Sequence, residues 1–292
     1  MEDKTVTLNN GIEMPIIGIG TYTLTPEQAE NSVYNALKDG YRLIDTANAY
    51  MNERGVGRGI NRAIEEGIVS REEIFLTTKL WVSEYDTVSE SLDETLARLD
   101  QDYVDLVLLH QPYGNYTKAY LDLEKAVVDG RVRAIGLSNF NSRRFDKVMK
   151  VATIPPAVLQ NETHPYYHDL RMKAHIGEYG TVFEAWFSLG GRTETQSELF
   201  HDETILAIAD KYGKTAPQII LRWHLQTGSI AIPGSKNPDH IAENYDIFDF
   251  ELTSEEMEQL NGLNRGDRAF KMPDILQRIM FTSNRPDFNA QQ

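Results

Sequence analysis

Short apolar runs recur along the chain, and each is followed by a longer stretch with a helical pattern. The eight runs are IIGIG (16–20), RLIDTA (42–47), IFLTTKL (74–80), YVDLVLLH (103–110), RAIGLSN (133–139), AVLQNET (157–163), TVFEAWF (181–187) and GSIAIPG (228–234). Nearly continuous apolar runs that alternate with helices are typical of a parallel sheet covered by helices on its faces. Eight such units predict a closed (β/α)8 TIM barrel rather than an open doubly wound sheet.

The stretches between the runs have the pattern of surface helices. TVSESLDETLARL carries apolar residues at positions 88, 92, 96 and 99, which form one stripe of a helix. SVYNALKDG and KAYLDLEKAVVDG both end on glycine, a common signal for the end of a helix. The second to fifth runs start 32, 29 and 30 residues apart (74−42, 103−74, 133−103), as successive strand–helix units require.

Two further segments flank the repeating units. TVTLNNGIEMPIIGIG predicts an N-terminal β-hairpin with Asn10 and Gly11 at its turn, which could cap the bottom of the barrel. No linker divides the chain, so we expect residues 1–292 to form one barrel domain. The C-terminal tail, 265–292, contains enough apolar residues to fold over the mouth of the barrel.

Composition excludes several classes of function. The formal net charge of −15 argues against binding to nucleic acid or to an anionic membrane, which needs basic patches. The chain has no cysteine, so disulfides and thiolate chemistry are excluded. The polar start, MEDKTVTLNNG, does not resemble a signal peptide, and no apolar run approaches the ~20 residues that span a bilayer. We therefore expect a cytoplasmic protein, acting as a monomer on a small molecule.

Polar side chains follow the ends of the predicted strands, where the active sites of such barrels lie. Asp45, Lys79 and His110 leave the second, third and fourth strands in turn. Buried charges are costly unless they are paired, so core packing alone does not explain this set. The remaining residues at strand ends are Ser138, Asn139, Gln160, Trp186 and Ser235.

Asp45, Lys79 and His110, taken with the nearby Tyr50, suggest acid–base chemistry. A nearby ammonium stabilises a phenolate, so we expect Lys79 to lower the pKa of Tyr50 from its usual ~10. Asp45 is the available counter-ion for Lys79. His110 can donate a hydrogen bond to a carbonyl oxygen. The group could protonate a carbonyl oxygen while a nicotinamide supplies hydride to the carbon.

At this point the sequence resembles the aldo-keto reductases, from about Thr7 to Phe250. The resemblance rests on seven segments in the family's order: DTANAY, LTTKLW, LLHQP, AIGLSNF, LQNETHPY, EAWFSLG and IPGSKNPDHIAEN. It implies an NAD(P)H-dependent reductase of aldehydes and ketones. Tyr50 would be the general acid, Lys79 and Asp45 would tune it, and His110 would orient the substrate.

The resemblance also implies a cofactor site without a metal. Ser138, Asn139 and Gln160 would bind the nicotinamide carboxamide, and Trp186 would stack on the nicotinamide ring. Tyr22 and Trp81 would line a substrate pocket with aromatic walls. The other residues expected at the cofactor are Leu189, Ser235, Lys236, His240, Glu243 and Asn244.

Two segments depart from the family pattern. Members that bind NADPH usually carry a lysine and an arginine where this chain has Gly234 and His240. Lys236 could bind the 2′-phosphate instead, so NADPH is expected, while NADH or dual use stays open. Phe187 and Ser188 replace a more usual Ser-Pro pair, which leaves that loop less restricted.

The same residues also fit simpler structural roles and two different functions. Asp45 alone could be a helix N-cap, Tyr50 could be core packing and Lys79 could be a surface residue. Within catalysis, Lys79 could instead form a Schiff base, although a close carboxylate would keep it charged. Outside catalysis, the chain could be a nucleotide-binding regulatory subunit with little turnover.

Overall fold

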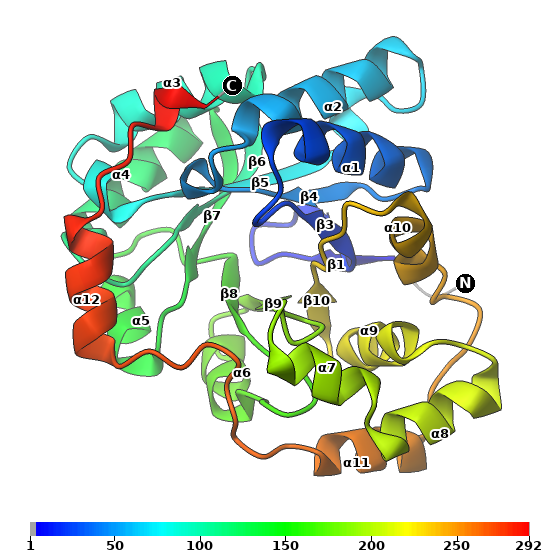
Figure 1. Cartoon of the computed structure of the whole chain (residues 1–292). Helices are drawn as coiled ribbons and strands as arrows, with labels where there is room; N and C mark the ends of the chain where they lie inside the picture. Colours follow the sequence, from blue (N-terminus) through cyan, green and yellow to red (C-terminus); the bar gives the residue numbers. More distant parts are fainter. Residues whose placement is uncertain (1–3, 292) are drawn as a thin grey trace.

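In the computed structural model, which describes residues 4–291, eight parallel strands curl into a nearly closed barrel (Figure 1). The strand order is β10-β9-β8-β7-β6-β5-β4-β3, and a bridge between Ile17 and Ala231 joins the two edges. The strands are β3 (Gly18–Gly20), β4 (Leu43–Asp45), β5 (Phe75–Leu80), β6 (Val104–Leu109), β7 (Val132–Ser138), β8 (Val158–Glu162), β9 (Val182–Trp186) and β10 (Ser229–Ala231). Each lies within one of the eight apolar runs or within one residue of it, so the predicted barrel is confirmed.

Helices cover the outside of the barrel. They are α1 (Pro26–Lys38), α2 (Glu53–Glu65), α3 (Val88–Leu99), α4 (Tyr116–Val128), α5 (Ser142–Met149), α6 (Leu170–Gly177), α7 (Glu194–Phe200), α8 (Glu203–Tyr212), α9 (Ala216–Gln226) and α10 (Pro238–Tyr245). A capping box at Thr25 starts α1, and Gly40 follows its end with φ +104°, a conformation that favours glycine. Among the described residues, no helix is long and apolar enough to cross a membrane.

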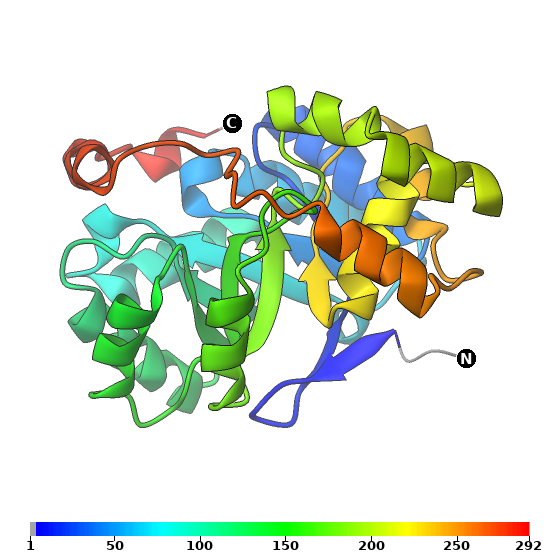
Figure 2. The ribbon, with the colours of Figure 1, turned by 90° about the horizontal axis from the view of Figure 1, so that it is seen from below.

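The predicted hairpin is present at the N-terminus. Strand β1 (Thr5–Thr7) pairs antiparallel with β2 (Glu13–Pro15), and Gly11 in the turn has φ +83°. Leu8 and Met14 are buried against apolar residues inside the barrel. Figure 2 shows the hairpin at one end of the barrel and the C-terminal segment at the other. The hairpin therefore closes the end opposite the mouth.

The barrel interior consists of an apolar layer and a polar layer. Inward-facing residues are two apart along a strand, and Leu43, Phe75 and Val158 belong to one buried apolar cluster. Two residues further along each of these strands are Asp45, Thr77 and Gln160, all of them buried. Polar groups are thus concentrated at the C-terminal ends of the strands, directly above an apolar base.

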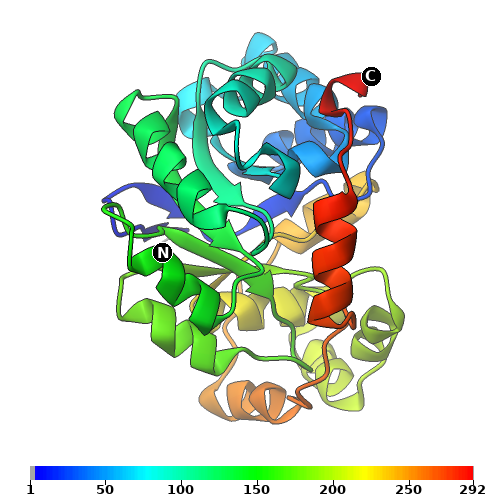
Figure 3. The ribbon, with the colours of Figure 1, turned by 90° about the vertical axis from the view of Figure 1, so that its left-hand side faces the viewer.

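The C-terminal segment runs along the mouth and returns to the N-terminal helices (Figure 3). This segment follows α11 (Ser254–Gly262) and contains α12 (Asp274–Ser283) and the 3₁₀ helix η4 (Phe288–Ala290). Phe281 packs on Trp81 with 5.3 Å between ring centroids, and the Trp81 Nε1 donates to the Asn284 carbonyl oxygen at 3.1 Å. Near its end, the segment supplies Asn289, whose Oδ1 accepts from the buried Arg98 at 3.0 Å.

Helix α2 approaches its neighbours so closely that an added Cβ would clash with a backbone atom at three of its positions, Gly55, Gly57 and Gly59. A Cβ added at Gly57 would lie 2.2 Å from the carbonyl oxygen of Leu99, at the end of α3. One added at Gly55 would lie 2.0 Å from the carbonyl oxygen of Pro26, at the start of α1. Because both obstacles are backbone atoms, neither can rotate away. This packing holds in place the helix that follows Tyr50.

Replacing Gly57 with alanine is expected to lower the free energy of unfolding by about 1–3 kcal/mol, the usual range for overpacking. The matched control is Gly262→Ala in α11, where an added Cβ meets nothing within 4 Å. That variant should be as stable as the native chain or up to about 1 kcal/mol more stable. Denaturant unfolding of both variants measures the difference, and equal stability would contradict the packing argument.

Candidate active site

Lys79 is the centre of a buried hydrogen-bond cluster at the mouth of the barrel. Its Nζ donates to Asp45 Oδ1 at 2.7 Å and Oδ2 at 2.8 Å, to the Thr46 carbonyl oxygen at 2.9 Å and to the Tyr50 hydroxyl at 3.1 Å. The Lys79 side chain is fully buried. Burial opposes its positive charge, but the attraction of Asp45 and Tyr50 outweighs that effect and raises the pKa of Lys79. The ammonium is therefore held in its charged form.

Local backbone structure explains how Asp45 and Tyr50 meet Lys79. Asp45 ends β4 next to β5, and the short 3₁₀ helix η1 (Asn48–Tyr50) then brings Tyr50 back toward the same strands. Met51 has φ +58°, which ends the turn. The N-cap positions of η1 and α2 are Ala47 and Asn52. Asp45 is therefore an ion-pair partner and not a helix cap.

The pKa of Tyr50 differs from the sequence-based expectation. Burial of the phenol raises this pKa to about 12, and the attraction of Lys79 lowers it only in part. The expectation that Lys79 would bring the pKa below its usual value considered the ammonium but not the loss of water around the ring. Tyr50 is therefore a protonated phenol throughout the neutral range.

His110 completes the cluster of four predicted residues. It follows β6, and its ring centroid lies 5.7 Å from that of Tyr50 and 5.1 Å from that of Trp81. Burial, together with the positive charge of Lys79, lowers the pKa of His110 well below its usual value. The imidazole is therefore neutral at pH 7. Its Nδ1 is buried and has no hydrogen-bond partner within residues 4–291.

Aromatic rings surround this cluster. Tyr22 lies beside Tyr50 with 5.0 Å between centroids and is 56% exposed. Trp81 is nearly buried, with Phe281 of the C-terminal segment against it. Phe281 also lies 6.0 Å from Tyr113. Of the two residues predicted to line a substrate pocket, Tyr22 thus lies against Tyr50 and Trp81 against His110, and Phe281 of the C-terminal segment lies against Trp81.

Gln160, on β8, connects the cluster to a second buried acid that the sequence analysis missed. Its Nε2 donates to Asp45 Oδ2 and to Glu184 Oε2, both at 2.8 Å. Glu184 lies inside the barrel on β9 and is fully buried. The signal for it was present, since a charged residue interrupts the apolar run TVFEAWF.

The other residues expected at the nicotinamide end lie at neighbouring strand ends. Ser138 ends β7, and Asn139 follows it with φ +67°. The Asn139 Nδ2 donates to the His110 carbonyl oxygen at 3.0 Å, which ties β7 to β6. Trp186 ends β9, and its buried Nε1 has no hydrogen-bond partner in the part of the chain described. The structure therefore brings these three residues to the same edge of the barrel.

The residues expected at the adenosine end follow β10. Ser235, whose Oγ accepts from the Asn237 backbone at 3.1 Å, starts the turn into α10. Lys236 and His240 are exposed on this turn and on the first part of the helix. Glu243 accepts from Thr215 at 2.5 Å, so its carboxylate is already engaged. Asn244, the last residue of this set, is buried in α10.

Gly234 has a structural reason to be glycine. An added Cβ would lie 2.7 Å from the carbonyl oxygen of Gly20, where the two edges of the barrel meet. A lysine, which the family pattern would place here, does not fit this backbone arrangement. The departure at Gly234 is therefore linked to barrel closure as well as to the cofactor.

The loop after β9, which lacks the more usual proline, places an aromatic ring beside the mouth of the barrel. Phe187 has φ +52°, and its ring packs on Trp186 at 4.7 Å and faces Tyr22 at 6.4 Å. Gly191 has φ +68°, and a Cβ there would lie 2.7 Å from the Phe187 ring. Leu189, predicted at the cofactor, is partly buried in the same loop. The Phe187 ring thus lies between two other aromatic rings, and the expectation of a less restricted loop stays a prediction.

No group of three or more acidic or histidine side chains within residues 4–291 could hold a metal ion. His164 contacts Glu162 at 3.3 Å, whereas His168 packs on Trp223 with 4.7 Å between centroids. Glu162 also accepts from the side chain of Arg268 at 3.0 Å, which holds the start of the C-terminal segment at the mouth. The sequence analysis did not predict this ion pair between Glu162 and Arg268.

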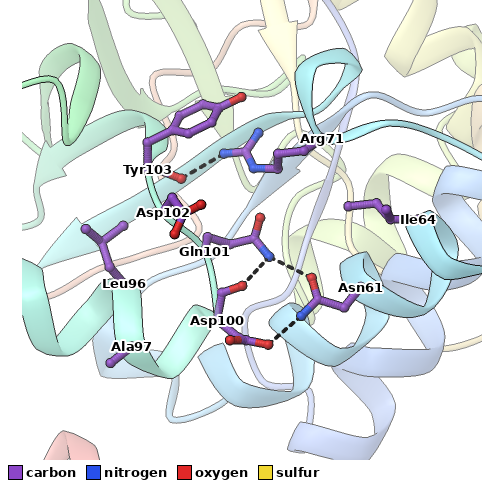
Figure 4. A pocket seen from close by; sticks show the side chains of 9 residues that line it. All are labelled: Asn61, Ile64, Arg71, Leu96, Ala97, Asp100, Gln101, Asp102 and Tyr103. Carbon is purple, nitrogen blue, oxygen red and sulfur yellow. Dashed lines mark hydrogen bonds between the residues drawn. The ribbon is translucent and has the colours of Figure 1, made fainter.

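A separate pocket of about 480 Å³ lies outside the barrel, between α2 and the connection from α3 to β6 (Figure 4). Its side chains bond mainly to one another, as Asn61 does to Asp100 at 2.7 Å and Gln101 to Asn61 at 2.9 Å. Arg71 is paired with Asp105 at 3.1 Å. The groups with acid–base chemistry are at the mouth instead, so this pocket is not the candidate site.

Comparisons with known proteins identify the family to which the chain belongs. The sequence pattern of the Aldo/keto reductase family matches residues 16–265. A glyoxal reductase of Bacillus subtilis is 41% identical over 276 residues, covering 93% of this chain and 97% of that protein. An NAD(P)H-dependent D-xylose reductase of Candida tropicalis is 38% identical over 302 residues, covering 90% and 93%. A crystal structure of a Bombyx mori aldo-keto reductase in complex with NADP matches with a TM-score of 0.87 and 34% identity, covering 93% and 96%.

Replacing Asp45 with leucine should lower the free energy of unfolding by about 3–5 kcal/mol, because Lys79 would be left buried without its counter-ion. The double variant Asp45→Leu/Lys79→Met removes both charges and should recover most of that loss. Denaturant unfolding of the two variants and the native chain measures this coupling. A double variant as unstable as the single one would show that the ion pair does not account for the stability.

Proposed function

The chain belongs to the aldo/keto reductase family, and on that basis we propose that it reduces aldehydes and ketones with NADPH, using Tyr50 as the general acid. The family assignment makes it an oxidoreductase that acts on carbonyl compounds and alcohols with a nicotinamide cofactor. The observation that carries the specific proposal is the contact of Lys79 Nζ with the Tyr50 hydroxyl at 3.1 Å, beside neutral His110.

The residues at the mouth fit a nicotinamide cofactor. Of the hydrogen bonds within residues 4–291, none ends on Gln160 Oε1, while its Nε2 is fully engaged. This oxygen can accept from a carboxamide, and Ser138 and Asn139 lie at the next strand end. Trp186 offers an aromatic face for the ring. The bound cofactor would supply hydride to the substrate carbon.

In the proposed mechanism the protein supplies a proton and a polar environment. Tyr50 donates its hydroxyl proton to the carbonyl oxygen as negative charge develops there. Lys79 stabilises the phenolate that remains, since its ammonium already donates to the same oxygen. Asp45 keeps Lys79 charged and in place. His110, neutral, donates a hydrogen bond from a ring nitrogen to orient the carbonyl.

The positive charge on Lys79 also argues against the Schiff-base hypothesis. A lysine that attacks a carbonyl must be neutral, whereas Asp45 and Tyr50 raise the pKa of this one. The Schiff-base hypothesis is therefore not supported. A regulatory subunit with little turnover would need no such proton donor, and turnover of a simple aldehyde distinguishes it from a reductase.

We propose an uncharged carbonyl compound of modest size as substrate, taken between Tyr22, Trp81 and the C-terminal segment. The aromatic walls favour apolar groups next to the reactive carbonyl. The segment 265–292 would act as the cover of this pocket within a single barrel domain. The cytoplasmic location and the monomeric state expected from the sequence remain predictions.

For the cofactor we propose NADPH, with Lys236 binding the 2′-phosphate and the backbone beside Ser235 following the adenosine. Lys236 is exposed at the start of α10, whose N-terminus favours negative charge. His240, Glu243 and Asn244 line the same helix. Use of NADH as well as NADPH is the alternative, because Gly234 and His240 replace the usual basic pair.

Replacing Tyr50 with phenylalanine should lower the turnover number for 4-nitrobenzaldehyde reduction by about 10²–10⁴-fold, the usual contribution of a general acid. The affinity for NADPH should stay close to native, because the aromatic ring remains. Cofactor absorbance follows turnover, and Tyr116→Phe on α4 is the matched control. Near-native turnover in Tyr50→Phe would contradict the mechanism. A native chain that binds NADPH but reduces no carbonyl would support the regulatory alternative.

Replacing Lys236 with alanine should raise KM for NADPH about tenfold, since a charge-assisted hydrogen bond to phosphate contributes about 1.5–3 kcal/mol. KM for NADH should stay unchanged, because NADH lacks that phosphate. Lys118→Ala, on the exposed face of α4, is the matched control for loss of a surface charge. An equal change with both cofactors would show that Lys236 does not select between them.

A further inference from the structure

Glu184 is a buried acid beneath the proposed site that the mechanism does not use. It lies on β9 between Gln160 of β8 and Ile230 of β10, with which it is in register. Its side chain is fully buried inside the barrel. An apolar residue of similar size would pack here without the cost of removing a carboxyl group from water. Packing alone therefore does not account for a carboxyl at this position.

The contacts of Glu184 lead to the proposed cofactor site through one side chain. Gln160 Nε2 donates to Glu184 Oε2 at 2.8 Å and to Asp45 Oδ2 at 2.8 Å. An amide nitrogen between two carboxyl groups has both of its hydrogens engaged, whereas the reversed amide would place an oxygen against the Asp45 carboxylate and would leave the carbonyl oxygen of Glu184 without a donor. Glu184 and Asp45 together therefore fix which end of the Gln160 amide faces inward.

Glu184 acts as an acceptor without needing a negative charge. Its Oε1 is buried and has no hydrogen-bond partner among residues 4–291, which is far more costly for a carboxylate than for an acid. Burial raises the pKa of Glu184 to about 8, and the negative charge of Asp45 on β4 adds to this, while Lys79 on β5 opposes it. At neutral pH the side chain is therefore mainly the neutral acid.

We propose that Glu184 is a positioning residue that holds the Gln160 amide nitrogen inward and so presents Gln160 Oε1 to the nicotinamide carboxamide. The inference rests on the proposed function, because it concerns the same cofactor. Glu184 contacts neither substrate nor cofactor in this scheme. Its influence passes through Gln160, which also gives Asp45 a second hydrogen-bond donor beside Lys79.

The test compares variants of Glu184 and Gln160 in the full chain. Glu184→Gln keeps a neutral acceptor of the same shape, and Glu184→Met keeps the volume but removes the acceptor. The Kd of NADPH, from quenching of tryptophan fluorescence, is the binding readout, and kcat and KM for 4-nitrobenzaldehyde are measured alongside. Thermal unfolding of each variant is measured without cofactor. It distinguishes a variant whose fold is destabilised from one in which only the Gln160 side chain is displaced.

Glu184→Gln should keep the Kd of NADPH within about twofold of native, because no charge is needed. Glu184→Met should raise the Kd of NADPH about tenfold, because the buried Gln160 amide would lose one hydrogen-bond acceptor. Its thermal stability should not fall to a matching extent. In a Gln160→Met background, Glu184→Met should have no further effect, since the side chain through which Glu184 acts is gone.

Three results would overturn the proposal: a native Kd in Glu184→Met, an equal loss in Glu184→Gln and Glu184→Met, or additive effects of the Gln160 and Glu184 substitutions. If Glu184→Met does not fold, Glu184→Val, a residue favoured in strands, replaces it in the same comparison. All of these comparisons require that the native chain binds NADPH and reduces 4-nitrobenzaldehyde. Failure of the native chain would instead contradict the proposed function.

Discussion

The buried ion pair between Asp45 and Lys79 is the interaction on which the proposed site depends. Two charges taken out of water destabilise a fold unless each finds partners, and here both do. Lys79 contacts two carboxylate oxygens, a backbone carbonyl and the Tyr50 hydroxyl. Asp45 accepts hydrogen bonds from Lys79 Nζ and from Gln160 Nε2. The pairing of β4 with β5 and the turn of η1 are what bring these groups together.

The two layers of the barrel interior have different roles: the apolar layer stabilises the fold, and the polar layer holds the groups proposed to react. The apolar layer at the N-terminal ends of the strands, with the hairpin against it, excludes water from below. The polar layer above it contains Asp45, Lys79, Gln160 and Glu184, all fully or almost fully buried. A polar cluster in such surroundings has strong electrostatic interactions, because little water is present to screen them. The arrangement can therefore hold an ammonium against a phenol at the mouth.

The sequence was sufficient for the architecture and for the members of the central cluster. Eight apolar runs that alternate with helical stretches leave few folds available, and in a barrel the residues at consecutive strand ends must meet. Asp45, Lys79 and His110 could therefore be grouped before any contact was known. Tyr50 could be added because it follows Asp45 by only five residues.

Properties that depend on the surroundings of a residue could not be predicted in this way. The pKa of Tyr50 results from a competition between burial and Lys79, and the sequence reveals the lysine but not the depth of burial. Glu184 was visible as a charge within a strand, yet its partner Gln160 follows from the register of β8 and β9. Glu162 and Arg268 are 106 residues apart in sequence, and no local pattern joins them.

The pH dependence of the two reaction directions tests the role of Tyr50 most directly. Reduction needs the protonated phenol, and the raised pKa of Tyr50 keeps it protonated, so kcat/KM for 4-nitrobenzaldehyde should be flat from about pH 6 to pH 9. Oxidation of the corresponding alcohol needs the phenolate, so its kcat/KM should rise steeply over the same range. A rate of oxidation that does not change with pH, or a rate of reduction that falls through neutral pH, would contradict the account.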